Sequence, residues 1–172
     1  MTWPHRAEFR PLDLLRVLVD SQVEFVVIGG FALAPHGYVR ATEDLDIVPA
    51  PKRESMEKLL RVVEQLEGVP VEMEGGLRPE EMPVPFGLDS LLDGGTWALS
   101  TTYGVLHVMQ FVKGAEDYDE LRASAISVPL EGVGDVWFAG REQLLRMKRD
   151  SPRLRDQSDV QELEMRAPRR DD

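Results

Sequence analysis

Cysteine is absent from the 172 residues of the chain. Its absence excludes disulfide bonds and thiolate metal ligands and fits a reducing compartment, so we expect a cytoplasmic protein. Long apolar runs are also missing, and residues 1–4 do not have the pattern that opens a signal peptide. We therefore expect no contact with a membrane.

Basic residues are scarce compared with acidic ones. The chain has 20 Lys and Arg against 31 Asp and Glu, which gives a formal net charge of −11. Nonspecific affinity for nucleic acid comes mainly from Lys and Arg at phosphates, so strong binding of this kind is not expected. A local basic run near the C-terminus fits a nucleic-acid surface and a solvated helix face equally well. It comprises Arg141, Arg146, Lys148, Arg149, Arg153 and Arg155.

The length and the hydrophobic periodicity predict one α/β (α+β) domain, with a small mixed sheet flanked by helices. We expect this domain to cover residues 1–166, with a helical segment at about 141–166 and a disordered tail at 167–172. Helices are predicted over 11–20, 51–66, 88–92, 115–123, 141–149 and 156–166, the last capped by Asp156. Strands are predicted over 23–28, 42–48, 69–73, 97–100, 105–112, 126–130 and 136–139. Residues 74–95 otherwise form a long loop.

A glycine pair follows the first predicted strand. Gly29 and Gly30 come directly after the apolar run 25–28 and before a predicted short helix over 31–37. Glycine allows positive φ and lets a phosphate approach without a Cβ in the way. The N-terminus of the short helix would offer free N–H groups to an anion. The pair predicts a phosphate cradle, with an ordinary turn as the alternative.

Two carboxylates lie on the next predicted strand. Because side chains alternate along a strand, Asp44 and Asp46 point to one face while Leu45 and Ile47 point into the core. Such carboxylates repel each other, and a divalent cation or a raised pKa relieves the repulsion. Hard oxygen ligands favour Mg²⁺ or Mn²⁺ when substrate phosphates complete the coordination. A charged edge strand without a ligand is the alternative.

Taken together, these features resemble a known family. Gly29-Gly30 followed by Asp44-Leu45-Asp46-Ile47 resembles the signature of the nucleotidyltransferase fold typified by DNA polymerase beta. Residues 40–46, Arg-Ala-Thr-Glu-Asp-Leu-Asp, are most similar to the small bacterial nucleotidyltransferases related to abortive-infection toxins. Residues 101–108 resemble the strand that delivers a third carboxylate, and 144–163 the C-terminal helical motif. The resemblance covers about residues 22–163.

The resemblance implies a metal-dependent transfer of a nucleoside monophosphate from a nucleoside triphosphate to an acceptor. The acceptor could be RNA, protein or a small molecule, and a toxin-like role would imply an antitoxin partner. Asp44 and Asp46 would hold Mg²⁺ or Mn²⁺ as catalytic and metal residues. The nucleotide-binding residues would be Gly29, Gly30, Arg40, Thr42, Lys148 and Asp156.

Two residues depart from the family pattern. Phe31 replaces the usual Ser or Thr after the glycine pair, and His107 stands where a third Asp is expected. An imidazole can bind a metal through one nitrogen or accept a proton, so His107 is assigned to the catalytic and metal set. It brings no negative charge and is a softer ligand than a carboxylate. A catalytically impaired nucleotide-binding or protein-interaction module with the same fold is therefore the alternative.

A further alternative shares the chemistry and differs in the acceptor. An antibiotic-modifying nucleotidyltransferase would take a cationic small molecule, which an acidic chain attracts electrostatically. The sequence leaves these alternatives open.

Overall fold

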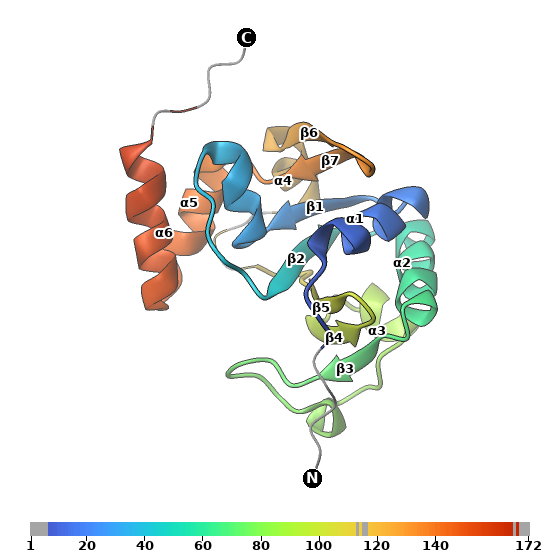
Figure 1. Ribbon diagram of the computed structural model, residues 1–172. Coiled ribbons are helices and arrows are strands. Elements are labelled where there is room, and N and C mark those ends of the chain that lie inside the picture. Colours follow the sequence, from blue (N-terminus) through green and yellow to red (C-terminus); the bar gives the residue numbers. More distant parts are fainter. Residues whose placement is uncertain (1–6, 113, 115–116, 167, 169–172) are drawn as a thin grey trace.

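A computed structural model describes residues 7–112, 114, 117–166 and 168 (Figure 1). Over these residues seven strands form one sheet in the order β3-β4-β5-β2-β1-β7-β6. The strands are β1 (Phe25–Ile28), β2 (Asp44–Pro49), β3 (Val69–Val71), β4 (Trp97–Thr101), β5 (Gly104–Val108), β6 (Ile126–Leu130) and β7 (Gly134–Phe138). The pairs β2–β5 and β1–β7 are parallel and the other pairs antiparallel, so the predicted mixed sheet is confirmed.

Helices flank the sheet, as predicted. The α-helices are α1 (Pro11–Asp20), α2 (Arg53–Gln65), α3 (Leu88–Leu92), α4 (Tyr118–Ser124), α5 (Arg141–Arg149) and α6 (Leu154–Met165). Two 3₁₀ helices, η1 (Phe31–His36) and η2 (Pro79–Glu81), lie in the connections. Figure 1 shows α5 and α6 together at one flank, well away from α1 and α2. None of the helices in the described part of the chain has the length and apolar character needed to cross a membrane.

One apolar cluster joins the sheet to its helices. The apolar stripe of α1 (Leu14, Leu15 and Leu18) and that of α2 (Met56, Leu59, Val62 and Val63) are buried in it. The alternate residues of β2, Leu45 and Ile47, are fully buried there too. Their neighbours Asp44 and Asp46 are therefore turned to the other face, as the strand period predicts.

Several predicted boundaries are wrong. The strand predicted to reach residue 112 ends at Val108, because Val108 faces Trp97, the first residue of β4. The helix predicted over 115–123 is α4; Asp117 caps it by accepting a hydrogen bond from the N–H of Glu120 at 2.9 Å. Residues 115 and 116 of that prediction lie outside the described residues, as does the predicted tail apart from Pro168.

The predicted cap of the last helix is also wrong. Helix α6 begins at Leu154, and Asp156 lies in its first turn rather than at its N-cap. The carboxylate of Asp156 instead accepts hydrogen bonds from Lys148 and Ser151. The ammonium of Lys148 is buried, and a buried charge requires an opposite charge and hydrogen bonds, which Asp156 helps to supply.

Candidate metal and nucleotide site

Three potential metal ligands meet on adjacent strands. The parallel register of β2 and β5 places His107 directly beside Asp46. Residues paired across neighbouring strands share a face of the sheet, so the imidazole lies on the face of the two carboxylates. Asp44, Asp46 and His107 each offer one ligand atom, and these atoms lie within 4.8 Å of one another. Two carboxylate oxygens and one imidazole nitrogen form a donor set that suits a divalent cation.

The imidazole is held by Asp46. Nδ1 of His107 lies 2.7 Å from Oδ1 of Asp46 and 4.0 Å from Oδ2 of Asp44. A carboxylate can only accept, so Nδ1 carries the hydrogen and the neutral ring presents a lone pair at Nε2. Burial lowers the pKa of His107, but the hydrogen bond to Asp46 and the charges of both carboxylates outweigh it and raise the pKa above its ordinary value.

The second carboxylate is electrostatically strained. Burial raises the pKa of Asp44, and the negative charge of Asp46 raises it further. His107 lowers the pKa of Asp44 in part, and the net shift is upward. A group whose charged form is disfavoured in this way gains most from a nearby cation.

Both glycines of the predicted cradle are packed against charged side chains. Gly29 has φ +70°, and a Cβ there would lie 1.9 Å from Oδ2 of Asp46. Gly30 has an ordinary φ of −66°, but a Cβ there would lie 2.8 Å from Nη1 of Arg40. The space opened by the missing Cβ atoms is thus used by the carboxylate and the guanidinium. The short helix predicted after them over 31–37 is the 3₁₀ helix η1.

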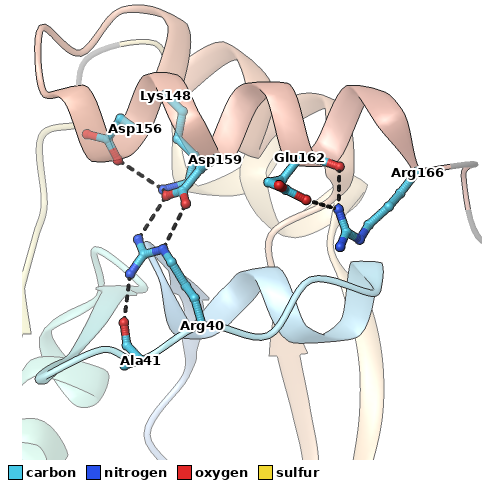
Figure 2. A network of polar contacts seen from close by, with 7 residues as sticks. All are labelled: Arg40, Ala41, Lys148, Asp156, Asp159, Glu162 and Arg166. Atoms are coloured by element: carbon cyan, nitrogen blue, oxygen red, sulfur yellow. Dashed lines mark hydrogen bonds and ion pairs between the residues drawn. The ribbon is translucent and has the colours of Figure 1, made fainter.

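A buried ion cluster joins Arg40 to the C-terminal helices (Figure 2). Asp159 of α6 accepts two hydrogen bonds from Arg40, at 2.8 Å from Nε and 2.8 Å from Nη2. The ammonium of Lys148 on α5 lies 2.7 Å from Oδ2 of Asp159 and 3.0 Å from Oδ1 of Asp156. Asp159 is fully buried and Lys148 is 5% exposed. Two cations and two carboxylates therefore balance, with Asp159 and Lys148 in the interior and the part-buried Arg40 and Asp156 beside them.

The cluster also fixes the charge of its central carboxylate. Burial alone raises the pKa of Asp159, but the hydrogen bonds from Arg40 and Lys148 and the charges of both outweigh it. The pKa of Asp159 therefore lies below its ordinary value. The hydrogen bond between Arg40 and Asp159 also raises the pKa of Arg40, although burial acts in the opposite direction.

Comparison with known proteins bears on the fold. No protein-family model matches the chain, and no curated protein matches it in sequence. Two solved structures of the antibiotic-resistance factor ANT(2'')-Ia match it with a TM-score of 0.54 each. The solution structure is 15% identical, over 88% of this chain and 81% of that one. The crystal structure with adenylyl-2''-tobramycin is 13% identical, over 88% and 86%.

A third solved structure is matched over its whole length. The Thermotoga maritima protein TM1012, described as a candidate nucleotidyltransferase, has a TM-score of 0.55 and 17% identity, over 95% of this chain and all of that one. The chain has the nucleotidyltransferase fold. At these identities the likeness is one of fold.

Within the nucleotidyltransferase fold, the residues singled out in the sequence form two adjoining groups. Asp44, Asp46 and His107 make the first, and Gly29 connects to it through its contact with Asp46. Arg40, Lys148 and Asp156 belong to the second, which reaches the glycine turn through Arg40 and Gly30. Thr42 lies between Arg40 and Asp44 in the sequence, and its hydroxyl donates to the backbone carbonyl of Asp44 at 3.2 Å.

Asp159 is central to the second group, although the sequence predicts for it only a helix face shared with Asp156. Asp159 follows Asp156 by three positions and so lies on the same helix face, which is the signal that the sequence contains. Its contacts with Arg40 and Lys148 depend on how α6 packs, which the spacing does not show. The Nε2 atom of His36 lies 2.9 Å from the backbone carbonyl oxygen of Ala139, a contact that fits a structural role.

Proposed function

We propose that the protein is a metal-dependent nucleotidyltransferase that moves a nucleoside monophosphate from a nucleoside triphosphate to an acceptor. The observation that carries this proposal is the Asp44–Asp46–His107 cluster beside the glycine turn of a nucleotidyltransferase fold. ANT(2'')-Ia, which has a similar fold, was solved with the nucleotidylated small molecule adenylyl-2''-tobramycin. That complex supports a nucleotide substrate for this chain.

Asp44 and Asp46 would hold Mg²⁺ or Mn²⁺. A bound divalent cation would supply neutralisation of the triphosphate charge and alignment of the leaving pyrophosphate. Arg40 and the glycine turn would bind phosphate oxygens, and Thr42 would hold the start of β2 through the carbonyl of Asp44. Lys148 and Asp156 would act indirectly: Lys148 pairs with Asp159, which binds Arg40, and Asp156 pairs with Lys148.

The chemical step follows from the same arrangement. The acceptor oxygen would form a bond to the α-phosphorus while the bond to pyrophosphate breaks. Nε2 is the one ring nitrogen of His107 left for a further contact, since Asp46 accepts the hydrogen of Nδ1. His107 would therefore either complete the metal site or take the acceptor proton. Asp46 would thereby orient the imidazole in addition to binding the cation.

The wider context is part of the same proposal. Residues 1–166 would act as one domain with the helical segment at about 141–166. The acceptor would be RNA, protein or a small molecule, and a toxin-like role would bring an antitoxin partner. A small cationic acceptor is consistent with the net charge of −11.

A second candidate function rests on the His107–Asp46 pair. The imidazole relieves part of the repulsion between the carboxylates without any cation, and it takes the place expected for a third acid. Such a site favours a module that binds a nucleotide, or a protein partner, without transferring anything. The two functions differ in whether pyrophosphate is released.

The test is pyrophosphate release from each of the four common nucleoside triphosphates, with Mg²⁺ or Mn²⁺, across RNA, protein and small-molecule acceptors. We expect release by the parent that depends on the metal and is lost in Asp44→Asn. Asp135→Asn, which removes an exposed carboxylate from β7, is the matched control and should behave as the parent. Triphosphate binding without release for any acceptor would favour the non-catalytic module.

A further inference from the structure

Arg40 makes an unusually close approach to the glycine turn. Its atoms Nη1, Nη2 and Cζ lie 2.8, 2.9 and 3.0 Å from the position that a Cβ of Gly30 would occupy. Gly30 has an ordinary φ, so the backbone does not require glycine here. The guanidinium requires it, because any larger side chain would displace Arg40. The turn and the arginine therefore fit together as one unit.

The guanidinium still has donors to offer. Asp159 takes the edge formed by Nε and Nη2, and the carbonyl of Ala41 accepts from Nη1 at 3.1 Å. Each terminal nitrogen of an arginine carries two hydrogens, so one on Nη1 and one on Nη2 have no hydrogen-bond partner within the described residues. A guanidinium held at one edge with donors left on its terminal nitrogens suits a phosphate oxygen.

Asp159, which binds the guanidinium of Arg40, is distant from it in the sequence and completely buried. Asp159 lies on α6, whereas Arg40 lies on the connection between η1 and β2 (Figure 2). Lys148 donates to the same carboxylate, so Asp159 stays charged between two cations. An arginine side chain loses considerable rotamer freedom when it binds a ligand. Because buried Asp159 accepts two hydrogen bonds from Arg40, the arginine has already lost that freedom before a ligand binds.

The charges on either side of the turn are complementary to a metal–triphosphate. Gly29 touches Asp46 of the candidate metal cluster, and the next residue, Gly30, touches Arg40. Successive Cα atoms are about 3.8 Å apart. The carboxylate of Asp46, a candidate metal ligand, and the guanidinium of Arg40 therefore lie against neighbouring residues of the same turn.

We infer that Asp159 is a positioning residue for phosphate binding: it holds Arg40 against Gly30 with the remaining guanidinium donors available to a phosphate group. Helix α6 is then part of the nucleotide site although Asp159 does not contact the nucleotide. This inference rests on the proposed function, because it requires a triphosphate at the glycine turn.

The test compares three variants by calorimetric titration with Mn²⁺–ATP and with Mn²⁺ alone. Asp159→Asn removes the charge that holds Arg40, and Arg40→Lys keeps a cation but lacks the fork that Asp159 binds. Both should weaken Mn²⁺–ATP binding by about tenfold or more and leave the affinity for Mn²⁺ alone unchanged. Glu162→Gln is the control on the same helix, since Glu162 pairs with Arg166 and not with Arg40.

Each outcome decides something. Parent-like Mn²⁺–ATP affinity in Asp159→Asn overturns the inference, whatever the result for Arg40→Lys, and leaves the proposed function standing. A parallel loss of affinity for Mn²⁺ alone shows a general structural role and also overturns it. If Asp159→Asn does not fold, Asp159→Glu, which keeps the charge but displaces the carboxylate from the Arg40 fork, takes its place in the same titrations. No binding of Mn²⁺–ATP by the parent overturns the inference together with the proposed function.

Discussion

His107 donates a hydrogen bond from Nδ1 to Oδ1 of Asp46 over 2.7 Å, joining the two strands that carry the candidate metal ligands. The pairing gives Asp46 a partner before any cation binds. Asp44 is less well compensated, since Nδ1 of His107 lies 4.0 Å from it. The two carboxylates of the cluster are therefore unequal, although the sequence presents them as a matched pair.

The raised pKa of His107 predicts a pH-dependent stability. The folded pKa lies above the ordinary value of about 6.5, so protonated His107 stabilises the fold. This contribution is complete below about pH 6.5 and is lost as the pH rises through the folded pKa. It amounts to about 1.4 kcal/mol for each unit by which the pKa is raised.

Urea unfolding of the metal-free protein between about pH 6 and 9 measures this loss. The free energy of unfolding of the parent should fall across that range, and His107→Gln should remove the decline. His36→Gln, which changes a histidine bonded to a backbone carbonyl, should retain it. Parallel curves for the parent and His107→Gln would contradict the assignment.

Gly29→Ala should damage both the fold and the cluster. An alanine at φ +70° is strained, and its Cβ would collide with Oδ2 of Asp46. Gly75→Ala is the matched control, because Gly75 has φ +73° and no atom lies within 4 Å of the place that its Cβ would take. We expect the strain to cost about 1–2 kcal/mol in each. Thermal unfolding should show a larger loss for Gly29→Ala, and only that variant should lose Mn²⁺ affinity; equal effects would contradict the contact.

Local patterns were enough to predict much of the fold. Helical periodicity gave α1 and α5 their observed bounds, because each buries one apolar stripe. Strand alternation placed Asp44 and Asp46 opposite the buried Leu45 and Ile47. These features depend on neighbours a few residues away, which the sequence displays.

Contacts between segments distant in the sequence could not be predicted from these local patterns. The bond between His107 and Asp46 depends on the register of two parallel strands. The sequence predicts Lys148 as a charged residue on a solvent-facing helix, yet it is buried and paired with two carboxylates of α6. Its ammonium contacts Asp159 and Asp156, and these contacts depend on how α6 packs, which the sequence does not display.

Lys148→Met should strongly destabilise the protein. Removing the ammonium leaves Asp156 and Asp159 with one fewer buried cation, at a cost of about 3–5 kcal/mol. Lys58→Met, which breaks a surface pair with Glu54, should unfold close to the parent in the same denaturation experiment. A midpoint for Lys148→Met equal to that of the parent would mean that the cluster contributes no net stability.

His107→Asp should change the preferred metal. The variant has three carboxylates in place of two and an imidazole, and hard oxygen donors favour Mg²⁺ over the softer mixed set. We expect the ratio of Mg²⁺-dependent to Mn²⁺-dependent pyrophosphate release to rise by about tenfold, with higher total release. An unchanged ratio would argue against His107 as a metal ligand.

The central claim is that Asp44 and Asp46 bind a metal–triphosphate. Calorimetric titration of the parent and of the double variant Asp44→Asn, Asp46→Asn with Mn²⁺–ATP tests it most directly, because asparagine keeps the size of both side chains and removes their charge. The account predicts saturable binding by the parent and no measurable binding by a double variant that remains folded. The same affinity in both proteins would contradict it.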